Sequence, residues 1–134
     1  MKEPIKLIGN VASPYTRKMI AYLRYKRIPY EVIWSQPEDV LKKMNIEPPK
    51  PILLPVFILD RDGQASAVTD STPLIREFEE YYPDRSVLPK DPALNFINFI
   101  LEDFGDEWCT KFMFHYRWHF NEDADNAGTI LPLG

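Results

Sequence analysis

Ser13 is the first residue of the chain whose type and position could do chemistry. It precedes Pro14 and Tyr15, between the short apolar segment Ile5–Gly9 and a segment with helical periodicity. The start of a helix leaves backbone N–H groups unpaired and carries the positive end of the helix dipole, which favours an anion. Ser13 is therefore either an N-cap and nothing more, or a hydroxyl donor beside an anionic group such as a thiolate.

Two further residue pairs can also be interpreted either as purely structural or as part of a ligand site. Leu54-Pro55 stands near the start of an apolar run, and proline cannot donate to a central strand ladder. The pair is either a plain strand entry or a cis peptide bond, and a cis bond would turn the backbone groups of Leu54 toward an extended peptide. Asp70-Ser71 caps a helical segment, and the same groups can also hold a carboxylate.

The elements that position these residues alternate between strand and helix. Periodicity predicts a strand at Ile5–Gly9, a helix at Pro14–Lys26 and a strand at Tyr30–Trp34, which together form a βαβ unit with a parallel strand pair. The next predicted elements are a short helix, two strands and a helix, over residues 36–43, 53–59, 65–69 and 70–81. The sequence thus predicts an α/β fold, ordered β-α-β-α-β-β-α, with a mixed four-stranded sheet.

The chain changes character after residue 82. Residues 83–92, PDRSVLPKDP, predict an extended linker. A long helix is predicted over residues 93–120, and it is apolar on too many sides for a lone surface helix. We therefore expect partners around it, whereas residues 121–134 are expected to form a loose tail.

Composition limits the classes of function. With 134 residues, 45% hydrophobic and 27% charged, the chain has the profile of an ordinary globular protein. The net charge of −4 argues against a nucleic-acid or membrane-surface binder, which would show a basic face. The single cysteine, Cys109, excludes an intrachain disulfide and a CxxC redox pair. Together with an N-terminus that lacks a long apolar run, it predicts a cytoplasmic location.

Two residue sets of the long helical segment contain types that can bind a metal ion or act as a nucleophile. His115 and His119 have a spacing that suits a metal ion, but no motif places a third ligand, so no metal site is predicted. Cys109 follows Trp108 on an aromatic helix with no cation placed beside it. It is therefore expected to be a buried small hydrophobe rather than a nucleophile.

Three motifs in register resemble a known family. The segments 13-SPYTRKMIAYLRYKRIPYE, 53-LLPVFIL and 70-DSTPLIREFEEYYPD are similar to the first helix, the cis-proline strand and the third helix of glutathione S-transferases. The serine before Pro-Tyr is typical of their tau, theta and zeta-like classes. The resemblance implies a thioredoxin-like glutathione-binding domain over residues 1–83 and a linker over 84–92. Residues 93–134 would then be the start of an all-helical C-terminal domain.

The resemblance also implies a role for individual residues. Ser13 would be the catalytic residue, hydrogen-bonding the glutathione sulfur and favouring its thiolate. Leu54 and Pro55 would hold the cysteinyl part of the tripeptide, and Asp70 and Ser71 its γ-glutamyl end. The activity implied is transfer of alkyl or aryl groups from a small electrophile to glutathione as co-substrate, by a homodimer and without a metal.

The sequence departs from this family in two places. Leu53 stands where the family usually has a lysine that contacts the glycyl carboxylate, and the nearest lysine is Lys50. The helical domain is also shorter than the family's, so the chain is either a fragment of a longer protein or a reduced relative. Both departures keep open an alternative, a non-catalytic binding or dimerisation module in which Ser13 is only a cap. A glutaredoxin-type oxidoreductase is rejected because it needs a cysteine in place of Ser13.

Overall fold

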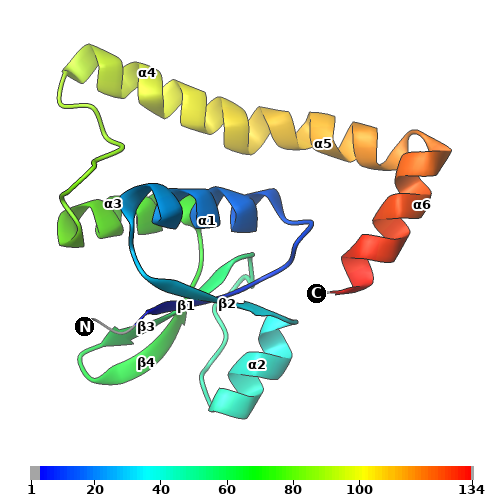
Figure 1. Ribbon diagram of the computed structural model, residues 1–134, viewed down its shortest axis with the longest axis horizontal. Coiled ribbons are helices and arrows are strands. Elements are labelled where there is room, and N and C mark those ends of the chain that lie inside the picture. Colours follow the sequence, from blue (N-terminus) through cyan, green and yellow to red (C-terminus); the bar gives the residue numbers. More distant parts are fainter. Residues whose placement is uncertain (1–3, 134) are drawn as a thin grey trace.

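The computed structural model describes residues 4–133 as a four-stranded sheet flanked by helices, with a long helical rod beside it (Figure 1). The strands β1 (Ile5–Gly9), β2 (Tyr30–Trp34), β3 (Val56–Arg61) and β4 (Gln64–Val68) lie in the order β2-β1-β3-β4. β1 and β2 are parallel, whereas β3 is antiparallel to both β1 and β4. The predicted mixed sheet and its parallel opening pair are confirmed.

Helices cover both faces of the sheet. Helices α1 (Pro14–Lys26) and α3 (Ser71–Tyr81) lie on one face, and α2 (Pro37–Met44) lies on the other (Figure 1). The larger core cluster fills the space between the sheet and α1 with α3, and a smaller one lies under α2. The largest side chains of the two clusters that are fully buried are Leu7, Met19, Leu23 and Phe57, and Ile8, Leu41 and Val56, respectively.

The third strand differs from the predicted one. It was expected over residues 53–59, but the ladder begins at Val56 and runs to Arg61. Pro55 has no N–H to donate, and the Thr69 hydroxyl bonds the carbonyl oxygens of Leu53, at 2.6 Å, and Pro55, at 3.4 Å. The residues before Val56 are therefore held as a loop beside the sheet.

The C-terminal part is entirely helical. Helix α4 (Pro92–Asp103), the π-helical turn η1 (Phe104–Trp108) and α5 (Cys109–Trp118) form one rod that passes over α1 and α3 (Figure 1). The chain then reverses into α6 (Asn121–Ile130) and the short turn η2 (Leu131–Leu133). The expected loose tail is wrong, because acidic residues in the first turn of α6 suit a helix start and Ala127 packs into the body.

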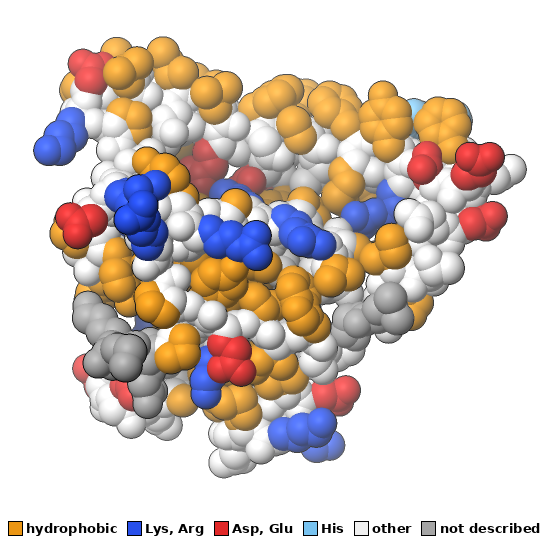
Figure 2. All heavy atoms as spheres, in the orientation of Figure 1, with side chains coloured by type: hydrophobic (Ala, Val, Ile, Leu, Met, Phe, Trp, Pro, Cys, Tyr) orange, Lys and Arg blue, Asp and Glu red, His pale blue; other side chains and the backbone are white. Residues whose placement is uncertain are grey.

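The rod bonds the body through polar residues and leaves many of its apolar residues exposed. All residues of α4, η1 and α5 are described, and none is buried. Figure 2 shows hydrophobic side chains gathered along the outer edge of this rod. Cys109, expected to be buried, is half-buried. Within residues 4–133, no helix has the length and apolarity needed to cross a membrane.

Candidate functional site

Four of the five predicted site residues line one hollow. Ser13, Leu54, Asp70 and Ser71 surround a space of about 430 Å3, which lies between the start of α1, the loop before β3 and the start of α3. Pro55 is buried behind Leu54 and is not part of the lining. The sequence motifs, 58 residues apart from first to last, thus meet at one place.

Ser13 caps α1, and its hydroxyl keeps a free proton. The Thr16 N–H donates to Ser13 Oγ at 3.2 Å, and the Ser13 N–H donates to the carbonyl of Asn10 at 3.1 Å. The side chain accepts the capping bond through a lone pair, so its O–H remains able to donate to an anion in the hollow. Capping and ligand binding are compatible at this residue.

Gly9 fixes how close the start of α1 lies to the sheet. A β-carbon at Gly9 would lie 2.5 Å from Thr16 Cγ2 and 2.9 Å from Thr16 Oγ1, and Thr16 is fully buried. A glycine at the end of β1 therefore lets the first turn of α1 pack against the strand. This contact sets the position of Ser13 at the edge of the hollow.

Leu54 lines the hollow, and its backbone groups have no hydrogen-bond partner within residues 4–133. The Leu54-Pro55 bond is cis, one of the two alternatives left open by the sequence, and Lys50-Pro51 is a second cis bond. Within residues 4–133, neither the N–H nor the C=O of Leu54 takes part in a hydrogen bond. Both groups remain available to an extended peptide.

Asp70 and Ser71 form the opposite wall at the start of α3. Asp70 Oδ1 accepts from the Thr72 N–H at 3.3 Å, so the expected cap is present. The φ angle of Asp70 is 81°, a left-handed conformation that residues with a β-carbon seldom adopt. Ser71 is buried, and its Oγ accepts from Lys18 Nζ at 3.2 Å, which leaves its own proton free.

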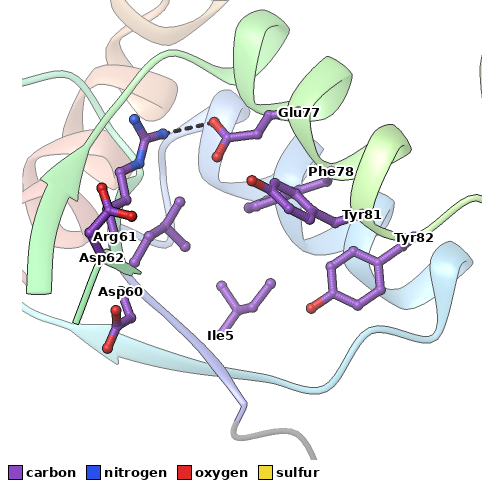
Figure 3. Close-up of a pocket in the computed structure, with 9 residues that line it drawn as sticks. Ile5, Asp60, Arg61, Asp62, Glu77, Phe78, Tyr81 and Tyr82 are labelled. Atoms are coloured by element: carbon purple, nitrogen blue, oxygen red, sulfur yellow. Dashed lines mark hydrogen bonds and ion pairs between the residues drawn. The ribbon is translucent and has the colours of Figure 1, made fainter. Parts of the chain in front are cut away.

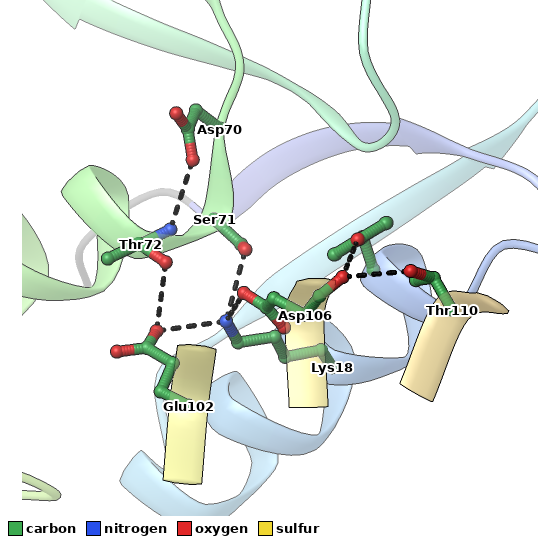
Figure 4. A network of polar contacts seen from close by, with 8 residues as sticks. Lys18, Asp70, Ser71, Thr72, Glu102, Asp106 and Thr110 are labelled. Carbon is green, nitrogen blue, oxygen red and sulfur yellow. Dashed lines mark hydrogen bonds and ion pairs between the residues drawn. The ribbon is translucent and has the colours of Figure 1, made fainter. Parts of the chain in front are cut away.

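Lys18 ties the wall of the hollow to the helical rod. Its Nζ lies 2.9 Å from Glu102 Oε1 and 2.6 Å from Asp106 Oδ2, and the Thr72 hydroxyl donates to Glu102 Oε1 at 3.0 Å (Figure 4). Burial alone would lower the pKa of Lys18, but its hydrogen bonds to Asp106 and Glu102 outweigh it and raise the pKa. The positive charge beside Ser71 is therefore permanent near neutral pH.

Tyr15 lines the hollow, but its hydroxyl proton is engaged in a hydrogen bond within the protein. Its hydroxyl donates to the carbonyl of Asp106 at 2.6 Å. Burial, followed by the negative charges of Asp106 and Glu107, raises the pKa of this phenol. Ser13 rather than Tyr15 is the hydroxyl at the start of α1 that can donate to a thiolate.

A comparison with known families decides the assignment. The family model described as "Glutathione S-transferase, N-terminal domain" matches residues 7–86, which contain nearly all of the sheet, helices α1 to α3 and the four predicted site residues that line the hollow. This chain belongs to the glutathione S-transferase family. The resemblance carried by the three motifs and the predicted thioredoxin-like fold are confirmed.

Individual relatives agree with this family. Glutathione S-transferase U6 of Arabidopsis thaliana is 28% identical over 90 residues, which cover 67% of this chain and 39% of that protein. Glutathione S-transferase U4 of the same plant is 27% identical over 109 residues, which cover 78% and 47%. The chain therefore spans less than half the length of the curated relatives it matches.

Solved structures show the same fold. A glutathione S-transferase from Methylobacterium radiotolerans, in complex with glutathione sulfonate, has a TM-score of 0.68 at 24% identity and covers 85% of this chain and 52% of its own. A glutathione S-transferase from Rhodospirillum rubrum has a TM-score of 0.59 at 28% identity, with coverages of 77% and 45%. A tau-class glutathione S-transferase from mango has a TM-score of 0.60 at 24% identity, with coverages of 96% and 58%.

The hollow of this glutathione S-transferase relative has an acidic wall that the sequence did not reveal. Asp106 and Glu107 of the rod line it beside Asp70, and its lining holds no cation. Leu53, in the place of the family's usual lysine, lines the hollow with an exposed side chain, and Lys50 does not line it. Thr72 was recognisable as the neighbour of Ser71, whereas Asp106 and Glu107 reach the site only through the packing of a distant helix.

A second hollow, of about 510 Å3, contains none of the predicted site residues. It lies where Ile5 of β1 and the end of β3 face α3, and the Arg61–Glu77 ion pair, at 2.8 Å, spans one side of it (Figure 3). In the rod, the rings of His115 and His119 stack at 4.5 Å. Among the described residues, no group of three or more His, Cys, Asp or Glu side chains could hold a metal ion.

Proposed function

We propose that this protein binds glutathione in the hollow beside Ser13 and stabilises its thiolate for attack on an electrophilic substrate. The observation that supports this most directly is the convergence of Ser13, Leu54, Asp70 and Ser71 on one space in a chain of this family. A structural neighbour with the same fold was solved in complex with glutathione sulfonate, which supports glutathione as the ligand proposed here.

Ser13 is proposed as the catalytic residue. Its free O–H, together with the N-terminus of α1, would hydrogen-bond the sulfur and favour the anion. A free thiol has a pKa near 8.5, and lowering it by about two units, or about 2.7 kcal/mol, makes it mostly thiolate at neutral pH. No covalent intermediate with the protein is needed, because positioning and thiolate stabilisation carry the reaction.

The rest of the tripeptide matches the other walls. The unpaired N–H and C=O of Leu54, held by the buried Pro55, would pair with the backbone of the cysteinyl part. The Ser71 hydroxyl, close to Lys18, suits the γ-glutamyl carboxylate, and the acidic side chains of Asp70 and Asp106 suit its ammonium group. The glycyl carboxylate would lie near Leu53, which offers it no charge.

We also propose that a second copy of this chain covers the outer face of the α4–η1–α5 rod. Leu94, Ile97, Leu101 and Trp108 are each more than half exposed on that rod. Monomers seldom expose apolar patches larger than about 300–600 Å2, and a stable interface buries roughly 800 Å2 per partner. The cytoplasmic location and the domain limits, 1–83, 84–92 and 93–134, remain predictions from the sequence.

Isothermal titration with glutathione tests the proposal. We expect micromolar to low-millimolar binding to the unmodified chain, weakened by Ser71→Ala. A pH titration that follows the thiolate absorbance of the complex should give a lower thiol pKa than that of free glutathione. Ser13→Ala should restore the pKa of free glutathione while leaving binding largely intact.

Two matched variants separate capping from catalysis. Ser13→Thr keeps both the cap and the hydroxyl, so the lowered thiol pKa should persist. Ser13→Asp keeps the cap but replaces the donor by a negative charge, so the thiol pKa should rise. Absence of binding to the unmodified chain would overturn the proposal, as would an equal thiol pKa in all four forms.

The alternative, a non-catalytic binding or dimerisation module, is favoured by one observation. The hollow has three acidic side chains in its lining and no cation, although glutathione carries a net negative charge. If the acidic lining prevents the binding of glutathione, Leu53→Lys should restore binding by supplying a positive partner for the glycyl carboxylate. Binding by Leu53→Lys and not by the unmodified chain would support the module.

A further inference from the structure

The second hollow lies at the opposite end of α3 from the proposed glutathione site. Its volume is about 510 Å3, and its walls are the start of β1, the end of β3 with the turn that follows, and the last turns of α3 (Figure 3). The proposed glutathione site adjoins the start of α3 instead, and the two linings share no residue. Binding in one hollow therefore does not require the residues of the other.

One side of this hollow is apolar and aromatic, and its residues are Ile5, Leu59, Phe78, Tyr81 and Tyr82. Phe78 is buried and meets the Tyr82 ring edge to face at 6.5 Å, whereas Tyr81 is 67% exposed. Within residues 4–133, the Tyr81 ring contacts no other aromatic ring and no cation. Because the face of an aromatic ring carries partial negative charge, Tyr81 offers a surface that attracts a cation.

The other side of the hollow is acidic. Asp60 lies at the end of β3 and Asp62 in the turn after it, and both are exposed. Asp60 Oδ1 accepts from the Gly63 N–H at 2.8 Å. The second oxygen of Asp60 and both carboxylate oxygens of Asp62 have no partner in the described part of the chain. Three carboxylate oxygens are thus available to a ligand.

The charge of the lining favours a cation. Arg61 is the single positive residue in it, and Arg61 Nη2 lies 2.8 Å from Glu77 Oε2, so that its charge is already matched (Figure 3). Among residues 4–133, no cation forms an ion pair with Asp60 or Asp62. These two negative charges therefore remain uncompensated beside the aromatic side of the hollow.

An aromatic face opposite carboxylates is an arrangement that suits an organic ammonium ion, which gains cation–π attraction and charge pairing together. We propose that this hollow binds a small organic ammonium ion, with its methyl or methylene groups against Tyr81 and its charge facing Asp60 and Asp62. This inference does not depend on glutathione binding, because none of these residues lines the proposed glutathione site.

A pair of probes with nearly the same shape tests the need for a positive charge. Choline and its uncharged isostere, neohexyl alcohol, differ in that a carbon atom replaces the nitrogen. Each is titrated without glutathione at constant ionic strength, and the methyl NMR signals of Ile5 and Leu59 report binding in the hollow. We expect choline to shift both signals saturably and to bind at least about fivefold more tightly than the alcohol. Equal affinities, or no saturable shift with choline, would overturn the proposal.

Variants of both sides locate the site. Asp60→Asn, Asp62→Asn and Tyr81→Leu should each weaken choline binding about threefold and leave the alcohol unchanged. The amide in Asp60→Asn still accepts from the Gly63 N–H, and asparagine tolerates the φ of 57° in Asp62→Asn, so both variants should fold. Glu80→Gln, on α3 but outside the hollow, is the matched control and should change nothing.

The opposite results identify non-specific attraction or a different site. If the aspartate variants weaken choline binding and Tyr81→Leu does not, the ring takes no part and the proposal fails. It also fails if Glu80→Gln weakens choline as much as Asp60→Asn does, because the attraction is then not local. If Ser71→Ala weakens choline, the cation occupies the proposed glutathione site and the proposal fails as well. Absence of glutathione binding with retained choline binding would instead contradict the proposed function alone.

Discussion

The sheet region and the helical rod bury their side chains in opposite ways. Among the residues whose burial the structure describes, 4–132, all buried hydrophobic residues but one lie within residues 7–78, and the exception is Ala127 of α6. The rod meets the sheet region through polar contacts: Lys18 with Glu102 and Asp106, and Arg117 with the Ala12 carbonyl. One region is thus held by a core, and the other is attached by ion pairs and hydrogen bonds.

This difference predicts two classes of stability. Fully burying a large apolar side chain contributes about 1.5–3 kcal/mol, and partly exposed ion pairs contribute about 0–1 kcal/mol each. We therefore expect the sheet region to unfold as the cooperative unit and the rod to detach at lower cost. The predictions below test this contrast, from the largest expected effect to the smallest.

The largest effect is expected at a buried ion pair inside the sheet region. Lys26 Nζ lies 2.8 Å from Glu79 Oε1 with both side chains almost fully buried, and the Tyr22 hydroxyl donates to the same oxygen at 2.9 Å. Glu79→Gln leaves Lys26 buried without its counter-charge, which should lower the free energy of unfolding by about 3–5 kcal/mol. Urea denaturation measures it.

The matched control is the exposed pair of Arg61 and Glu77. Its side chains are 49% and 31% exposed, so Glu77→Gln should cost less than about 1 kcal/mol. Equal losses in Glu77→Gln and Glu79→Gln would show that burial does not distinguish the two pairs, and the contrast would fail.

The Glu79 carboxyl should also make the stability of the sheet region depend on pH in the acid range. Burial alone would raise the pKa of Glu79, but hydrogen bonds from Lys26 and Tyr22, among others, lower it below its ordinary value of 4.5. The unfolded chain therefore binds more protons at this site than the folded one. The stabilisation is complete above pH 4.5 and is lost as the pH falls through the lower, folded-state pKa. Denaturation midpoints from pH 6 down to about pH 3 should fall less steeply in Glu79→Gln.

The sequence predicted the helices of the sheet region and the helical rod far better than the segment after the rod, for the same physical reason. Local periodicity located Pro14–Lys26 and Ser71–Tyr81 to within a residue, because buried residues recur along each element. It missed α6 (Asn121–Ile130), where the single buried residue, Ala127, leaves no apolar stripe to read. The motifs likewise identified Ser13 and Ser71. Asp106 could not be found in this way, because it reaches the site through its contact with Lys18, which is 88 residues earlier in the sequence.

The outward face of the rod should control self-association rather than folding. Ile97 and Leu101 lie one helical turn apart and are 52% and 64% exposed. If a second copy covers them, Ile97→Gln with Leu101→Gln changes four side chains of the dimer and should weaken it about hundredfold, at about 0.7 kcal/mol per side chain, with little change in the unfolding of the sheet region. Sedimentation velocity over a concentration series measures this.

Trp34 supplies the control for that variant. It is 45% exposed at the end of β2, outside the rod, and Trp34→Gln should leave the dimerisation constant unchanged. A monomer at all concentrations for the unmodified chain would contradict the proposed covering by a second copy.

A smaller effect is expected where the sheet region positions Ser13. Gly9→Ala brings a β-carbon to 2.5 Å from Thr16 Cγ2, so the start of α1 must shift at a cost of about 1–3 kcal/mol. Thr16→Ser removes that methyl group and should recover part of the loss in the double variant, measured by thermal denaturation. Equal stabilities of Gly9→Ala with and without Thr16→Ser would show that the contact does not set the position of the helix.

The smallest effect is expected at the attachment of the rod. Lys18→Met removes the shared partner of Glu102 and Asp106 and leaves two carboxylates facing one another, so the rod should detach more easily by about 1 kcal/mol. Amide hydrogen exchange should accelerate about fivefold in α4 and α5 and remain unchanged in β1 and β3. Lys111→Met is the matched control, because Lys111 lies over the Trp108 ring within the rod and bridges nothing to the sheet region. If amide hydrogen exchange accelerated equally in the rod and in the sheet, the two regions would unfold as one unit and the contrast would be wrong. Weakening only the attachment of the rod should expose the amides of the rod alone.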